Sequence, residues 1–191
     1  MNRCNWATSE ILIDYHDHEW GILSFEDIAH FEHISLSGFQ AGLSWELILK
    51  KRAILRRMFS AFDPYRIAKF NQRRINNLLE YSSGIKNEKK IRSVINNAKA
   101  FISIRDKYGS FSRYLFSCFG NQVKVNRYKK WEDTPSFTKD SIKISNLLKK
   151  EHFSFLGPTI TYAYLQAVGF VDDHIEGCFR KNRNKVRDLI R

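Results

Sequence analysis

Residues 78–91 read Leu78-Leu79-Glu80-Tyr81-Ser82-Ser83-Gly84-Ile85-Lys86-Asn87-Glu88-Lys89-Lys90-Ile91, and their pattern predicts two helices joined by a tight turn. Apolar residues at helical spacing lead into a Ser-Ser-Gly break, and a second helical pattern begins directly behind it. This is the outline of a helix–hairpin–helix, in which free backbone amides and a helix N-terminus can bind an anion. Gly84 permits the turn, and Lys86, Lys89 and Lys90 supply positive charge for backbone phosphates. An ordinary corner between two helices with a glycine cap is the alternative.

Positive charge is concentrated around this hairpin. The 191 residues have a formal net charge of +12, yet residues 1–49 contain one basic and eight acidic side chains, a net of −7. Residues 50–99 contain fourteen basic and three acidic side chains, a net of +11. A block this one-sided indicates a polyanionic partner such as nucleic acid, with a lysine-rich but ordinary surface as the alternative. No isolated basic amphipathic segment indicates a membrane surface.

Helical periodicity continues on both sides of the hairpin, and proline is scarce. Helix starts are expected at Ser24, at Ser44 and at Asp63-Pro64, because these residue types cap or begin helices. The longer predicted helices cover residues 45–62, 89–108, 141–152 and 158–169. A short ribbon is expected around residues 123–125. The pattern predicts an all-α fold.

Two pairs of metal-binding side chains lie at opposite ends of the chain. Cys4 and His16 have eleven residues between them, and His174 and Cys178 have three. The second pair falls on one face of a helical turn, and two thiolates with two imidazoles suit tetrahedral zinc with no open position. Spacing alone leaves a frayed N-terminal cysteine and a buried thiol as the alternative, because Cys-x11-His is no standard zinc knuckle. His18 is a competing ligand.

Composition places the chain among folded globular proteins, since 43% of the residues are hydrophobic and 14% are aromatic. Three cysteines are too few and too odd in number for a disulfide scaffold. With no signal peptide or membrane-spanning run in the sequence, a cytoplasmic, nucleoid-associated protein is expected. We expect one globular unit over residues 1–179, with residues 50–110 carrying the hairpin and the basic face and the termini forming the metal lobe. Residues 180–191 form a basic tail that we expect to be flexible.

Five further motifs point to one family. They read Arg3-Cys4-Asn5-Trp6, Tyr15-His16-Asp17-His18-Glu19-Trp20-Gly21, Gln40-Ala41-Gly42-Leu43-Ser44-Trp45, Gly157-Pro158-Thr159-Ile160-Thr161-Tyr162 and Gln166-Ala167-Val168-Gly169-Phe170-Val171-Asp172-Asp173-His174. With the hairpin, the matches run from residue 3 to residue 178. The chain resembles the bacterial DNA-3-methyladenine glycosylase I family, zinc-containing relatives of the helix–hairpin–helix glycosylases. The resemblance implies that fold, with the N- and C-terminal segments joined by one structural zinc on Cys4, His16, His174 and Cys178.

The resemblance also implies a pocket that holds a flipped, methylated base between aromatic rings. Tyr15 and Trp45 match the rings of the family, Trp6 and Trp20 lie nearby in the motifs, and Gln40 keeps a polar position. Methylation at N3 leaves adenine cationic, so an aromatic face offers it cation–π attraction and stacking. Core packing is the alternative for each single ring. The implied enzyme is a monomer that hydrolyses the N-glycosidic bond of alkylated adenine in double-stranded DNA and leaves an abasic site, without a redox or nucleotide cofactor.

One position departs from the pattern of this family. Ser37 stands where the family carries a glutamate that hydrogen-bonds the methylated base, and Phe39 replaces a residue that is usually polar. Losing a charged hydrogen bond costs ~1.5–3 kcal/mol, but a cationic purine is a good leaving group and positioning does much of the work. No catalytic residue is assigned, and Asp17 and Glu19 are expected to support a zinc ligand or to lie on the surface. A lesion-binding protein with weak catalysis and a glycosylase with altered base specificity remain the alternatives.

Overall fold

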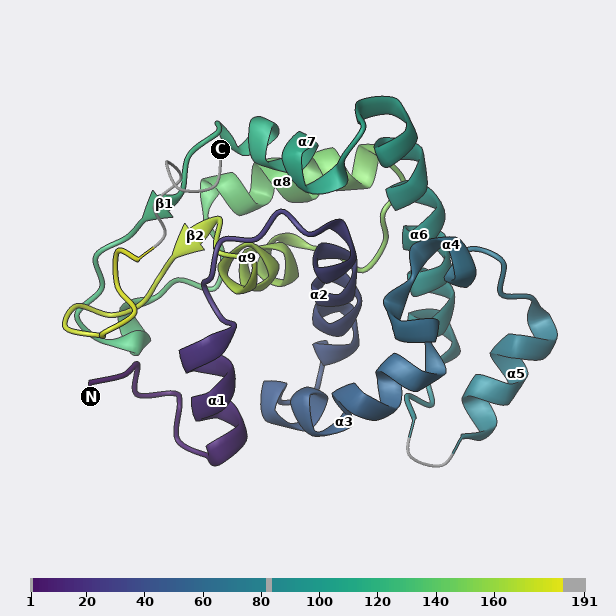
Figure 1. Cartoon of the computed structure of the whole chain (residues 1–191), viewed down its shortest axis with the longest axis horizontal. Helices are drawn as coiled ribbons and strands as arrows, with labels where there is room; N and C mark the ends of the chain where they lie inside the picture. The colour runs from purple at the N-terminus through teal and green to yellow at the C-terminus, as the bar shows by residue number, and fades with distance from the viewer. Residues whose placement is uncertain (1, 82–83, 184–191) are drawn as a thin grey trace.

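The structure, a computed structural model, describes residues 2–81 and 84–183. Helices dominate it, as the sequence predicts, and a small pair of strands lies at one end (Figure 1). The helices are α1 (Glu10–His18), α2 (Asp27–Gln40), α3 (Trp45–Met58), α4 (Pro64–Ile67), α5 (Gln72–Glu80), α6 (Glu88–Tyr108), α7 (Phe111–Phe119), α8 (Lys139–Lys150) and α9 (Pro158–Ala167). The strands are β1 (Lys124–Val125) and β2 (Val171–Asp172), and the single 3-10 turns are η1 (Ser60–Phe62) and η2 (Trp131–Asp133).

Two of the three predicted helix starts have the expected caps, whereas α2 begins at Asp27 after an N-cap at Glu26, two residues beyond the predicted Ser24. The Ser44 hydroxyl accepts a hydrogen bond from the Leu47 amide at 3.2 Å and begins α3. The Asp63 carboxylate accepts hydrogen bonds from the amides of Tyr65 and Arg66, and Pro64 fills the first position of α4. These side chains satisfy amides that have no partner inside the helix, which confirms both predictions.

The helix predicted over residues 45–62 is shorter than expected. α3 ends at Met58, and Ser60, Ala61 and Phe62 have φ angles of 52°, 54° and 56°. This left-handed region reverses the chain, so that Phe62 reaches the core from a turn and not from the helix. α1 and α7 are two helices for which the sequence analysis made no prediction.

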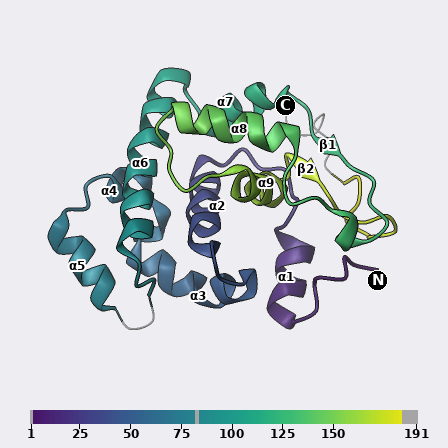
Figure 2. The ribbon, with the colours of Figure 1, turned by 180° about the vertical axis from the view of Figure 1, so that it is seen from behind.

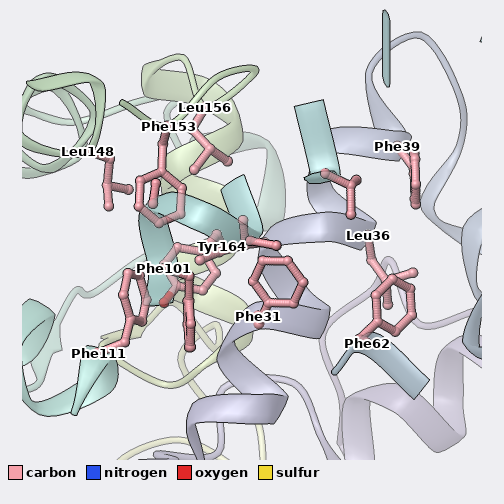
Figure 3. Packing of buried hydrophobic residues seen from close by; sticks show 14 of the residues in the cluster. Phe31, Leu36, Phe39, Phe62, Phe101, Phe111, Leu148, Phe153, Leu156 and Tyr164 are labelled. Atoms are coloured by element: carbon pink, nitrogen blue, oxygen red, sulfur yellow. The ribbon is translucent and has the colours of Figure 1, made fainter. Parts of the chain in front are cut away.

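The core surrounds α2, which stands beside α9 near the centre of the molecule (Figures 1 and 2). Phe31 of α2 packs against Phe101 of α6, with ring centroids 5.2 Å apart, and Phe101 stacks on Phe111 of α7 at 4.3 Å (Figure 3). Tyr164 of α9 is fully buried, and its hydroxyl lies 2.6 Å from Nδ1 of His30. Packing on both sides fixes the ends of α2 and α9 relative to α6 and α7.

The two ends of the described chain lie together at the end of the molecule that also holds α1 (Figures 1 and 2). The Phe179 amide donates a hydrogen bond to the Asn2 carbonyl at 3.0 Å. β1 and β2 pair in parallel, with Lys124 opposite Val171. The ribbon predicted around residues 123–125 is therefore present, and its partner is a strand close to the C-terminus.

Only the start of the predicted basic tail belongs to the described chain. The Lys181 ammonium donates to the His174 carbonyl at 2.7 Å, and the Asn182 amide donates to the Asp172 carboxylate at 2.9 Å. Residues 184–191 lie outside the described residues, so the flexibility of the tail stays a prediction, as does a single unit over residues 1–179. Within residues 2–81 and 84–183, no helix has the length and apolar character that crossing a membrane requires.

Candidate active site and metal centre

A cavity of about 340 Å³ opens where the first residues of the chain, α1, α2, α3, η2 and α9 meet. All six residues predicted to bind a base line it, namely Trp6, Tyr15, Trp20, Ser37, Gln40 and Trp45. Its other walls come from Leu12, Ser44, Glu46, Trp131, Ala163, Gln166 and Ala167. The structure thus brings together side chains that lie up to 161 residues apart in the sequence.

Aromatic rings form most of this cavity. The Tyr15 and Trp45 rings lie 5.4 Å apart between centroids, and Trp6 meets Trp20 edge-on at 5.1 Å. Trp131 closes the group at 6.0 Å from Trp6 and 5.9 Å from Trp20. The sequence analysis did not single out Trp131, because its segment is polar and irregular and only the ring itself signals a role. Edge-on and tilted pairs at these distances hold the rings apart and leave faces for a planar ligand.

Polar groups at the cavity wall come from the ends of α2 and α9 and from the start of α3. Ser37 is 1% exposed and lines the cavity from the last turn of α2. Gln166 donates its side-chain amide to the Asp173 carboxylate at 2.6 Å, which fixes its orientation. Phe39, the other departure from the family pattern, packs on Phe59 in the core with ring centroids 5.2 Å apart and is not among the residues that line the cavity.

Tyr15 is a buried polar group of the cavity. Burial raises the pKa of its phenol, and the nearby Glu19 carboxylate adds to the increase. The phenol therefore keeps its proton at neutral pH, and the side chain offers a ring face and a neutral hydroxyl.

Asp17 and Glu19 do not line the cavity, in agreement with the expectation from the sequence. Asp17 pairs with Arg3 at 2.7 Å and accepts from Nδ1 of His16 at 2.8 Å. Glu19 pairs with Arg52 at 2.5 Å and lies 3.0 Å from His33. Both carboxylates are thus engaged elsewhere, the first of them on a predicted metal ligand.

Cys4, His16 and Cys178 form a compact buried cluster whose ligand atoms lie within 4.8 Å of one another. The His174 ring lies 5.2 Å from the His16 ring, and its Nε2 atom is buried without a partner among the described residues. His18 is exposed and bonds Asp14 at 3.0 Å, so it does not compete as a ligand. Three of the four predicted ligands form the cluster, and the fourth stands beside it.

The chemistry of this cluster fits a metal ion. Nδ1 of His16 bonds Asp17 at 2.8 Å and Nδ1 of His174 bonds Asp172 at 3.0 Å, which is how carboxylates orient metal-binding imidazoles. The hydrogen bond from Cys4 lowers the pKa of Cys178 to about 4, and the same bond raises the pKa of Cys4. A thiolate is the form that binds a metal, and the unpartnered Nε2 of His174 supplies a further donor.

The hairpin between α5 and α6 presents only part of the predicted phosphate site. The Gly84 amide donates to the Tyr81 carbonyl at 3.0 Å and closes the turn, while Lys86 and Lys89 are exposed. Lys90 is 8% exposed, and its ammonium donates to the carbonyls of Phe39 at 2.8 Å and Ala41 at 2.6 Å. We therefore correct the expectation for Lys90, which satisfies the C-terminus of α2. Residues 82–83 lie outside the described residues.

The chain is similar to known proteins over nearly its whole length. A family model described as methyladenine glycosylase matches residues 6–181. The DNA-3-methyladenine glycosylase 1 of Escherichia coli (strain K12) is 37% identical over 179 residues, which cover 93% of this chain and 96% of that protein. The DNA-3-methyladenine glycosylase of Haemophilus influenzae is 39% identical over 177 residues, which cover 92% of this chain and 96% of that protein. A tyrosine-to-phenylalanine variant of a 3-methyladenine DNA glycosylase I, crystallised with 3-methyladenine, has a TM-score of 0.92 at 31% identity and covers 97% of this chain and 100% of that one.

Proposed function

This chain belongs to the methyladenine glycosylase family, and on that premise we propose that it is a DNA repair enzyme that removes 3-methyladenine. It hydrolyses the N-glycosidic bond between the alkylated base and the deoxyribose and leaves an abasic site. The observation that supports this best is the cavity of about 340 Å³ with walls of Tyr15, Trp45 and three further indole rings. A flat cationic purine is the ligand that such walls favour, through stacking and cation–π attraction.

The reaction needs positioning more than acid catalysis. Methylation at N3 places a positive charge on the purine, so the base can leave without first being protonated. Extruding the base from the duplex costs a few kcal/mol, and the aromatic walls offset part of that cost. Ser37 and the oriented Gln166 supply polar contacts at the edge of the base, and water is the nucleophile. No side chain is assigned as a general base.

Double-stranded DNA that contains alkylated bases is the proposed substrate. The start of α6 presents backbone amides, and the exposed Lys86 and Lys89 add positive charge beside them. The net charge of +11 over residues 50–99 supports DNA binding by the part of the molecule that carries this hairpin. We propose that the enzyme acts as a monomer in the bacterial cytoplasm, where it meets the nucleoid.

We propose that Cys4, His16, His174 and Cys178 hold one structural zinc ion. The buried cluster of three donors, the unpartnered Nε2 of His174 and the carboxylates behind both imidazoles support this set. Four protein ligands leave no open position, so the ion supplies a cross-link between the ends of the chain and no hydrolytic chemistry.

Base release from methylated DNA tests the proposal. DNA treated with a methylating agent is incubated with the protein, and free 3-methyladenine is measured against a heat-inactivated control. Release in proportion to enzyme concentration is expected. Because Ser37 is neutral, a binding protein with weak catalysis is the second candidate, and it predicts retention of methylated DNA with no release at excess protein. The second result would overturn the proposed activity.

A further inference from the structure

Glu46 is the one carboxylate among the described residues that line the aromatic cavity. It occupies the second position of α3, directly after Trp45, so one helix start delivers both a ring and a negative charge to the same wall. Its side chain is one-third exposed and forms an ion pair with Lys50 at 2.8 Å, one helical turn away.

The other groups of the wall leave a cationic ligand without a negative partner. Ser37, Gln40, Ser44 and Gln166 are neutral, and the remaining lining side chains are apolar or aromatic. Asp17 and Glu19 are bound to arginine side chains and do not reach the cavity. A purine methylated at N3 carries its positive charge into this space, and opposite charge is a strong source of preference in a desolvated pocket.

We infer that Glu46 is the anionic residue by which this pocket selects cationic, alkylated purines, and that it takes the role left open by Ser37. The inference deepens the proposed function and rests on it. It places the residue that determines specificity at the start of α3, whereas α2 contributes the neutral Ser37 to the same pocket.

The present partner of Glu46 does not prevent this role. The hydrogen bond from Lys50 lowers the pKa of Glu46, so the carboxylate is ionised at neutral pH. An exposed pair at positions i and i+4 of a helix contributes little to stability, so the carboxylate can turn from Lys50 to a bound cation at small cost.

Two purines that cannot be cleaved separate charge from shape. The 3,9-dimethyladeninium ion carries the permanent charge of the lesion, and 9-methyladenine is its neutral counterpart. Quenching of tryptophan fluorescence measures the Kd of each for the folded protein. The wild type is expected to prefer the cation, and Glu46→Gln, which keeps size and shape, is expected to lose roughly tenfold to hundredfold of that preference.

The chain offers a matched control in Asp140, which lies in the first turn of α8, pairs with Lys124 and is similarly exposed, but lies outside the cavity. Asp140→Asn should leave the preference unchanged. Lys50→Met removes the competing cation and should raise the preference. Placing the carboxylate on α2 instead, in Ser37→Glu combined with Glu46→Gln, should restore it.

The outcomes separate this inference from the proposed function. An unchanged preference in folded Glu46→Gln, or a fall in Lys50→Met, would overturn the role of Glu46 even if the wild type releases 3-methyladenine. Absence of base release by the wild type would instead overturn the proposed enzyme activity, whatever the two purines show.

Discussion

Trp45 occupies the first position of α3, where its indole lines the cavity with its ring centroid 5.4 Å from that of Tyr15. Stacking of a base on an aromatic ring is worth ~1–3 kcal/mol, so kcat/KM for release of 3-methyladenine should fall about 5- to 150-fold in Trp45→Ala. Trp45→Phe keeps an aromatic face and should retain most of the activity. Steady-state base release measures both variants, and thermal unfolding checks that they are folded.

Trp45 also packs against the hydrophobic core, so stability and activity must be separated. If folded Trp45→Ala released base as fast as the wild type, the assignment of this ring to the base pocket would be wrong. If Trp45→Phe lost as much activity as Trp45→Ala, a role of the indole N–H would replace stacking as the explanation.

For single residues, the sequence predicts the roles that depend on neighbours along the chain, but not the roles that depend on contacts with distant segments. Ser44 caps the amides three residues away, so its role follows from its neighbours along the chain. Lys89 and Lys90 are adjacent and chemically identical, yet only Lys90 turns inward, toward carbonyls some fifty residues earlier. Trp131 lines the aromatic cavity from an irregular segment, so no hydrophobic periodicity predicts its role.

The end of α2 depends on a lysine from α6. The Lys90 ammonium binds the carbonyls of Phe39 and Ala41, which flank Gln40 at the cavity wall. Lys90→Met leaves these carbonyls without their charged partner, so unfolding free energy should fall by about 1.5–3 kcal/mol and base release should weaken. Urea denaturation and kcat/KM measure the two effects.

The exposed lysines of the same hairpin provide the contrasting pair. Substituting Lys86 and Lys89 together by methionine should leave stability unchanged and weaken DNA binding for every sequence. The slope of log K for DNA binding against log salt concentration should become shallower by about two, because two phosphate contacts are lost. Lys90→Met should not change that slope. A salt slope that fell in Lys90→Met and not in the double variant would contradict both assignments.

An ion-pair network joins α1, α2 and α3 through Glu19, Glu32, Arg52 and Arg56. Burial works to raise the pKa of Glu19, but hydrogen bonds from His33 and Arg52 outweigh it and hold the pKa at about 2. The carboxylate therefore stabilises the fold fully above its ordinary pKa of about 4.5, and the contribution is lost as pH falls toward 2.

Glu19→Gln should consequently show a shallower loss of stability between pH 4.5 and pH 2 than the wild type. Urea midpoints at a series of pH values measure this dependence. Asp14→Asn is a suitable control, because Asp14 is exposed and pairs only with His18 among the described residues. Equal pH dependence in Glu19→Gln and the wild type would show that the network does not hold Glu19 ionised.

Some helices could be predicted from local sequence signals, and others could not. α7 has its N-cap at Ser110 and its C-cap at Gly120, which has a φ angle of 104°, so both a capping serine and a C-terminal glycine were available as local signals. α1 buries the neighbours Tyr15 and His16, because one faces the cavity and the other the metal cluster. Its buried residues therefore follow the site and not a helical stripe, and periodicity alone cannot find it.

At the scale of the whole molecule, the two ends of the chain close the site. The Asn2–Phe179 hydrogen bond and the cluster of Cys4, His16 and Cys178 join segments more than 160 residues apart. Spacing could name these ligands but could not choose between zinc and unrelated thiols, since Cys-x11-His has no standard geometry. The family resemblance made that choice, and the structure brings three of the four donors together.

A zinc cross-link at this point should determine how the whole chain unfolds. Purified protein is expected to contain about one zinc ion per chain, and Cys4→Ser or His174→Ala should lose it. Loss of a structural metal that binds only the folded state should cost about 3 kcal/mol or more, which lowers Tm by about 6–12 °C for a chain of this size.

Cys118→Ser is the matched control, because Cys118 lies on α7 outside the cluster and should change neither value. Elemental analysis and thermal unfolding decide the matter. Metal-free wild-type protein with the same Tm as Cys4→Ser would show that hydrogen bonds and packing alone hold the N-terminal segment against the C-terminal one.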